Sequence, residues 1–81
     1  MIIDHWKRVT SMAVSYRKLW KMLIDKDMKK KDLQAATKVS WATITRLSKS
    51  EPVSMEVLGR ICEVLDCDIG DIVEFVKEEE P

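Results

Sequence analysis

Apolar residues recur at helical spacing along most of this chain, and that spacing limits what it can fold into. Between Tyr16 and Ile24 they fall at positions i, i+3, i+4, i+7 and i+8, the pattern of a helix with one buried face. The chain has 81 residues with only two Gly and two Pro, so few residues interrupt helices. The sequence therefore predicts a small all-α domain built from short helices.

Five helices are expected, each with an apolar stripe, and four of them begin at a candidate N-cap. The candidate caps Ser15, Ser40, Ser54 and Asp68 carry side-chain oxygens that can accept from free backbone N–H groups. The expected helices cover about 16–27, 30–37, 41–48, 55–65 and 69–76. The last would align Ile69, Ile72, Val73 and Val76, although a brief strand near 2–3 or 13–15 stays open. We expect an N-terminal extension over 1–14, a domain over 15–77 and an acidic tail over 78–81.

Charge is divided between the two halves of the chain, although the net charge is zero. Residues 1–50 carry twelve basic and four acidic residues, a net +8, whereas residues 51–81 carry two basic and ten acidic residues, a net −8. This division favours an oriented anionic partner over mere solvation of the surface. No apolar run approaches the roughly 20 residues that span a bilayer, so a cytoplasmic protein with no membrane partner is expected.

Catalysis has little support in the residue types present. His5 is the only histidine, and no nucleophile motif, glycine-rich phosphate loop or paired carboxylate in an apolar setting is visible. Cys62 and Cys67 with one distant histidine do not form a zinc set, and they are interpreted as reduced thiols. The chain is therefore not expected to be an enzyme, and no cofactor, metal or small-molecule ligand is implied.

The segment 30–47, KKDLQAATKVSWATITRL, contains two short helices across a three-residue turn. Such a pair inside a small helical domain is the geometry of a DNA-reading helix-turn-helix. The inward positions would be taken by Leu33, Thr37, Val39, Ile44 and Leu47. The residues then left on or near the exposed side are Trp41, Ala42, Thr43, Thr45 and Arg46.

Residues 16–76 resemble the Cro/C1-type helix-turn-helix regulators, whose domain is of the lambda-repressor type. The resemblance is carried by YRKLWKMLIDKDMKKKDL, VSWATITRLSKSE and VSMEVLGRICEVLDCDIGDIVEFV. Two positions depart from the family pattern: Lys38 stands where a left-handed Gly is usual, at a cost of roughly 1 kcal/mol, and Gln34 where Ala is usual.

The resemblance implies that the chain regulates transcription by occupying an operator or promoter, with the second motif helix in the major groove. The residues it assigns to double-stranded DNA are Lys29, Lys30, Ser40, Trp41, Ala42, Thr43, Thr45, Arg46 and Lys49. Two alternatives remain open at this point: Trp41 packs or reads bases, and Arg46 contacts DNA or pairs with Asp32.

Most relatives are homodimers. Here the candidate dimer residues are Phe75, which is expected offset from the apolar stripe of the last helix, together with Val76 at the end of that stripe. The alternative function is a protein-interaction module, an antitoxin-like partner that uses the same fold.

Overall fold

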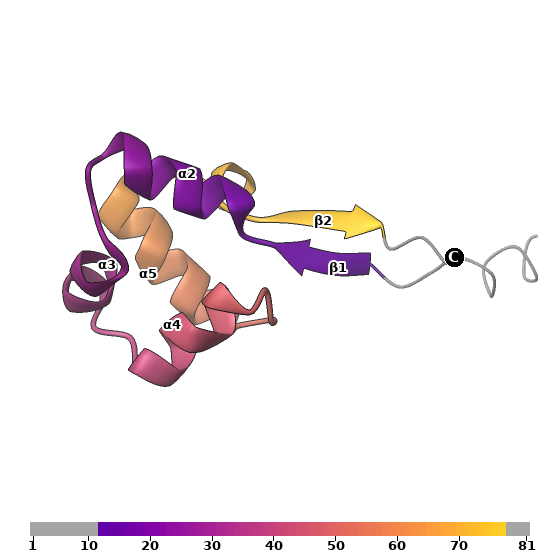
Figure 1. Cartoon of the computed structure of the whole chain (residues 1–81), viewed down its shortest axis with the longest axis horizontal. Helices are drawn as coiled ribbons and strands as arrows, with labels where there is room; N and C mark the ends of the chain where they lie inside the picture. The colour runs from indigo at the N-terminus through magenta and orange to yellow at the C-terminus, as the bar shows by residue number, and fades with distance from the viewer. Residues whose placement is uncertain (1–11, 78–81) are drawn as a thin grey trace, which may run out of the picture.

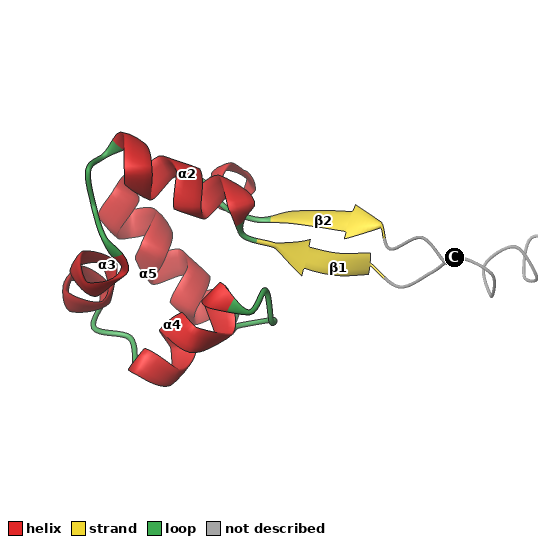
Figure 2. Ribbon diagram, viewed as in Figure 1, coloured by secondary structure: helices red, strands yellow, loops and turns green. Residues whose placement is uncertain are grey.

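The computed structural model describes residues 12–77 and shows a group of helices from which a two-stranded ribbon extends (Figures 1 and 2). In this view α5 lies at the centre, with α2, α3 and α4 around it. The elements in chain order are β1 (Met12–Ser15), α2 (Arg17–Asp25), α3 (Lys30–Thr37), α4 (Trp41–Ser48), α5 (Met55–Leu65), the 3₁₀ turn η1 (Ile69–Asp71) and β2 (Glu74–Lys77).

Serine caps start α4 and α5 where the sequence predicts. The Ser40 and Ser54 side chains accept hydrogen bonds from the backbone N–H groups three residues later, and each of these bonds measures 3.2 Å. Ser15 is not the cap of α2, because the helix begins after Tyr16, which makes no side-chain cap bond. Ser15 Oγ instead accepts from the backbone N–H of Arg17 at 3.3 Å.

A single apolar core holds the helices together. It is built from the periodic positions expected on each helix, with Val39 from the turn and Ile72 from the segment after η1. Ile24 is an exception: the α2 pattern predicts it inside, but within the described residues its side chain is 74% exposed in the last turn of the helix, which ends at Asp25. The buried apolar residues are Tyr16, Leu19, Leu23, Leu33, Val39, Ile44, Leu47, Leu58, Ile61, Leu65 and Ile72.

The expected fifth helix is wrong, and with it the all-α assignment. Asp68 does cap a helical turn, but only Ile69–Asp71 form it, and the chain then becomes the strand β2. β2 pairs antiparallel with β1, with Ala13 opposite Val76 and Val14 opposite Phe75. Apolar residues at 69, 72, 73 and 76 fit helical spacing, but the run 72–76 is also rich in β-branched and aromatic residues. Pairing with β1 decides between the two.

The strand left open at 13–15 is present as β1, which also includes Met12. The boundary expected at residue 15 therefore falls on the last residue of a strand. The segments 1–11 and 78–81 lie outside the described residues, as do the possible strand at 2–3 and the single histidine, His5. Within residues 12–77, no helix combines the length and apolar character needed to cross a bilayer.

Candidate nucleic-acid interface

The pair α3 and α4 forms a helix-turn-helix with the boundaries that the sequence predicts. Leu33 and Thr37 of α3 are buried, and Val39 fills the turn with only 4% of its surface exposed. Lys38 ends α3 with φ 60° and ψ 24°, the left-handed conformation expected at this position. The turn thus has the usual backbone of the motif without the usual glycine.

Gln34 compensates for this departure within the turn itself. Its side-chain amide donates to the carbonyl oxygen of Val39 at 2.8 Å, across the residue in the left-handed conformation. The backbone N–H of Lys38 also donates to the Gln34 carbonyl at 2.8 Å. The larger side chain at this position is therefore accommodated because it hydrogen-bonds the turn, which an alanine cannot do.

The two faces of α4 have opposite environments. Ile44 and Leu47 are buried in the core, which fixes the rotation of the helix about its axis. Trp41 is 55% exposed, so the alternative in which it is a packing residue finds little support. Ala42, Thr45 and Arg46 are exposed too, and Thr43 is half-buried. The helix thus presents an accessible face that carries an aromatic ring, a methyl group, a hydroxyl and a guanidinium.

The hydroxyls on α4 are already engaged within the helix. Ser40 Oγ accepts from the Thr43 backbone N–H and lies 3.0 Å from Thr43 Oγ1. Thr45 Oγ1 donates to the carbonyl of Trp41 at 3.0 Å. A hydroxyl has one proton, so Thr45 in this state can only accept from a further partner.

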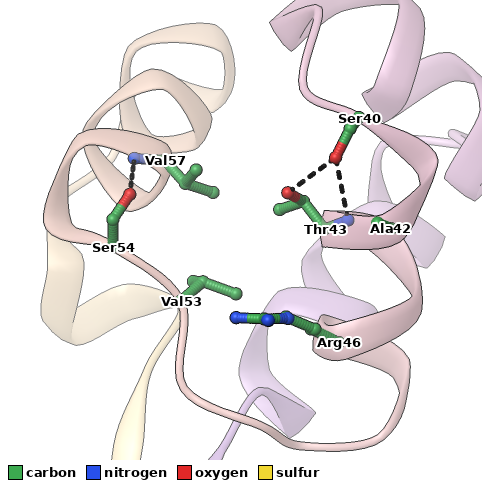
Figure 3. A pocket seen from close by; sticks show the side chains of 7 residues that line it. All are labelled: Ser40, Ala42, Thr43, Arg46, Val53, Ser54 and Val57. Atoms are coloured by element: carbon green, nitrogen blue, oxygen red, sulfur yellow. Dashed lines mark hydrogen bonds between the residues drawn. The ribbon is translucent and has the colours of Figure 1, made fainter.

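Arg46 lies at the edge of a cleft of about 320 Å³ between α4 and the start of α5. Figure 3 shows its guanidinium extending from α4 toward Val53, in the loop that precedes α5. The pairing with Asp32 is not formed: among the described residues Arg46 has no ion pair, and the Asp32 carboxylate accepts from the backbone N–H of Lys29 at 2.8 Å. The cleft is lined by Ser40, Ala42, Thr43, Arg46, Val53, Ser54 and Val57.

The three lysines expected near phosphates are exposed, but their surroundings differ. Lys29 precedes α3 and Lys49 follows α4. Lys30 is more constrained, because its Nζ donates to Ser48 Oγ at 2.9 Å and lies 4.7 Å from the centre of the Trp20 ring. Lys30 therefore joins the start of α3 to the end of α4, and Lys29 and Lys49 are freer to reach an anion.

Tyr16 holds the loop that forms one wall of the cleft. Its hydroxyl donates to the carbonyl of Glu51 at 2.7 Å, and the ring is buried. Burial raises the pKa of Tyr16, and the Val53 backbone lowers it by a smaller amount. Sequence reasoning placed Tyr16 in the core but missed this bond, because residues 35 positions apart carry no mark of their contact.

The comparisons with known proteins agree with this geometry. The model of the Cro/C1-type helix-turn-helix DNA-binding domain matches residues 18–78. The chain belongs to this family. The Cro/C1-type match includes α3, the turn and α4, and the three correspond to the motif inferred from the sequence.

A solved structure provides the second comparison. The crystal structure of the transcriptional regulator VanUg, Form II, is 54% identical in sequence, with a TM-score of 0.82. The match covers 88% of this chain and 95% of that one. The curated proteins include no match. Among residues 12–77, no cluster of three or more His, Cys, Asp or Glu side chains could hold a metal ion.

Proposed function

We propose that this DNA-binding protein is a sequence-specific regulator that acts by occupying an operator or promoter. The observation that carries the proposal is the orientation of α4. Because Ile44 and Leu47 are anchored in the core, the opposite face is held toward solvent in one orientation. A helix presented in this way fits the major groove of B-DNA. Since α2, α3 and α4 belong to the basic half of the chain, this surface also suits a polyanion.

Base contacts are assigned to the exposed face of α4. Arg46 can give a bidentate pair of hydrogen bonds to the O6 and N7 atoms of a guanine. The methyl group of Ala42 and the ring of Trp41 suit the methyl group of a thymine. Ser40 and Thr43 lie at the start of the helix, where the groove is approached most closely. Thr45, whose proton is used within the helix, would accept from an adenine or cytosine amino group.

Phosphate contacts are assigned to the two sides of this face. Lys29 and Lys49 flank the motif, and Lys30 could reach a phosphate only by leaving Ser48 and Trp20. The cleft beside Arg46 adds the first-turn N–H groups of α5, after the cap Ser54. Such N–H groups carry partial positive charge and favour an anion. These contacts would hold the protein in register on the duplex without reading its sequence.

The proposal is tested by titrating fluorescent duplexes, selected from a random pool, with the parent protein and two variants. Arg46→Ala should weaken the selected duplex by about 1–3 kcal/mol and relax preference at one position of the site. Lys49→Ala should weaken selected and random duplexes alike and make the dependence on log salt shallower by about one unit. Lys21→Ala, on the exposed surface of α2, is the matched lysine control.

Three outcomes would redirect the proposal. Absence of binding to any duplex at low salt, by a folded protein, would remove the regulator function. A stable complex with another protein under those conditions would favour the antitoxin-like interaction module instead. If Arg46→Ala weakens binding to selected and random duplexes equally, Arg46 contacts phosphate, and base contacts are reassigned to Trp41, Ala42 and Thr43.

We further propose that two copies bind an inverted repeat as a homodimer.

A further inference from the structure

Cys62 and Cys67 lie at the two ends of the turn that closes α5. Asp66 ends the helix in the left-handed conformation, with φ 53° and ψ 56°. The backbone N–H of Cys67 then donates to the carbonyl of Cys62 at 3.0 Å, so the chain folds back over the last turn of the helix. A bond of this span is typical of the Schellman motif, in which the side chains of the first and last residues are frequently in contact. The turn therefore sets the two cysteines side by side.

The two thiols are free and lie against each other. Both side chains are half-buried and pack against the core, and the two thiol groups share a hydrogen bond. A disulfide requires Cβ atoms about 4 Å apart, and thiols that already touch across one turn need little backbone movement to reach this separation. The half-exposed position also leaves both sulfur atoms open to a small reagent.

We propose that Cys62 and Cys67 form a reversible intramolecular disulfide by exchange with a low-molecular-weight disulfide such as oxidised glutathione. In the first step the thiolate of Cys62 attacks one sulfur of the small disulfide, which forms a mixed disulfide and releases one small thiol. The thiolate of Cys67 then attacks the sulfur of Cys62, and the second small thiol leaves. In total the protein gives up two electrons and two protons, and the small disulfide becomes two thiols.

The environment of Cys67 decides the order of these steps. Burial raises the pKa of Cys67 to about 11, with smaller upward contributions from Cys62 and Asp71 and a downward one from Lys26. Because the thiolate is the attacking species, a thiol with this pKa reacts slowly at neutral pH. Cys67 is therefore assigned the second, intramolecular step, in which its proximity to Cys62 offsets the scarcity of its thiolate.

The folded turn should favour this disulfide over the same bond in the unfolded chain. The bond closes a loop of six residues, and holding the ends of such a loop together lowers the entropy of the unfolded chain. The equilibrium constant for its formation should therefore be about 30-fold larger in the folded protein than in the unfolded chain. By the same cycle, the oxidised protein should melt roughly 10 °C above the reduced protein. The bond would fasten the end of α5 to the segment that leads into η1 and β2.

The test is a redox titration of the full chain in glutathione buffers, both in native buffer and in concentrated urea. Acid quenching, alkylation and intact-mass spectrometry count the free thiols at each ratio of thiol to disulfide. The constant should be about 30-fold larger in native buffer. The matched control is the double variant Cys62→Ser, Glu63→Cys, which keeps two thiols but moves one to an exposed position one residue along α5. This control should lose most of the preference, and a circular dichroism melt checks that it is folded.

Single variants test the order of attack. With oxidised glutathione, Cys67→Ser should accumulate a mixed disulfide on Cys62 at neutral pH. Cys62→Ser should be modified several-fold more slowly, and its rate should rise about tenfold per pH unit below the pKa of Cys67. Faster modification of Cys67 than of Cys62 at neutral pH would overturn the assigned order.

Three results would overturn the disulfide itself. Equal constants in native buffer and in urea would show that the fold does not bring the thiols together. A control variant with the same preference as the parent would refute the turn as the cause. Disulfides between two chains, seen as a doubled mass without reductant, would refute the intramolecular bond if they form in its place. None of these measurements uses DNA, so their outcome is independent of the proposed function.

Discussion

Replacing Lys38 by glycine should stabilise the protein. The lysine side chain is exposed, so its removal loses no contact in the core. Lys38 has φ 60°, where the Cβ of an L-residue crowds its own backbone. Glycine has no Cβ and takes this conformation readily. Among residues 12–77, three other non-glycine residues have positive φ, namely Asp27, Ser50 and Asp66. The short polar side chains of Asp27 and Asp66 tolerate this region better than lysine does.

The size of the effect follows from two opposing contributions. Left-handed backbone costs a side-chain-bearing residue about 1–2 kcal/mol, whereas glycine loses about 0.5–1 kcal/mol more conformational freedom on folding. The net gain for Lys38→Gly over Lys38→Ala should thus be about 0.75 kcal/mol, or about 3–6 °C in melting temperature. Lys38→Ala is the proper reference, because it removes the same charge and keeps the strain. Urea unfolding and thermal melting by circular dichroism measure both variants.

A second lysine gives the opposite sign and completes the test. Lys21 is exposed in the middle of α2, where φ is helical, so Lys21→Gly should be less stable than Lys21→Ala by about 1 kcal/mol. If glycine is also the less stable residue at position 38, the turn is not left-handed in solution and the reasoning fails.

Gln34→Ala should lower the free energy of unfolding by about 0.5–1.5 kcal/mol, since the Val39 carbonyl loses its donor.

Three further results are expected. Trp41→Ala should change the free energy of unfolding by less than about 0.5 kcal/mol but weaken duplex binding. Trp20→Ala removes a ring packed on the core and should lower the free energy of unfolding by about 2 kcal/mol. Equal losses in the two variants would make Trp41 a packing residue. Tyr16→Phe should cost about 1–2 kcal/mol in urea unfolding, because the Glu51 carbonyl loses its partner; an unchanged midpoint would contradict this. Burial, with a smaller contribution from Cys62, raises the pKa of the Cys67 thiol from 9.0 to about 11. The protonated thiol therefore stabilises the folded protein fully below pH 9, and this stabilisation is lost as the pH rises toward 11. In Cys67→Ala the free energy of unfolding should fall less between pH 9 and 11 than in the parent, and an equally steep fall would contradict the raised pKa.

Much of the site could be predicted because its determinants are local. Ser40 accepts from an N–H three residues away, and the periodicity of Ile44 and Leu47 decides which side of α4 is buried. Those two facts already place Trp41 and Arg46 on the accessible side. What the sequence left open was the partner of each group. Gln34 departed from the family pattern for no visible reason until the structure showed its bond to Val39.

Local patterning determined the four α-helices of this protein, because capping and a 3.6-residue period act over one or two turns of chain. It could not determine the C-terminal segment. Residues 69–76 satisfy helical spacing, but β2 forms where β1, about 60 residues earlier, supplies its hydrogen-bond partners. The same limit explains Ile24, which fits the apolar stripe of α2 but is 74% exposed among residues 12–77. Strand pairing and burial depend on residues far apart in the chain, so only the tertiary structure decided them.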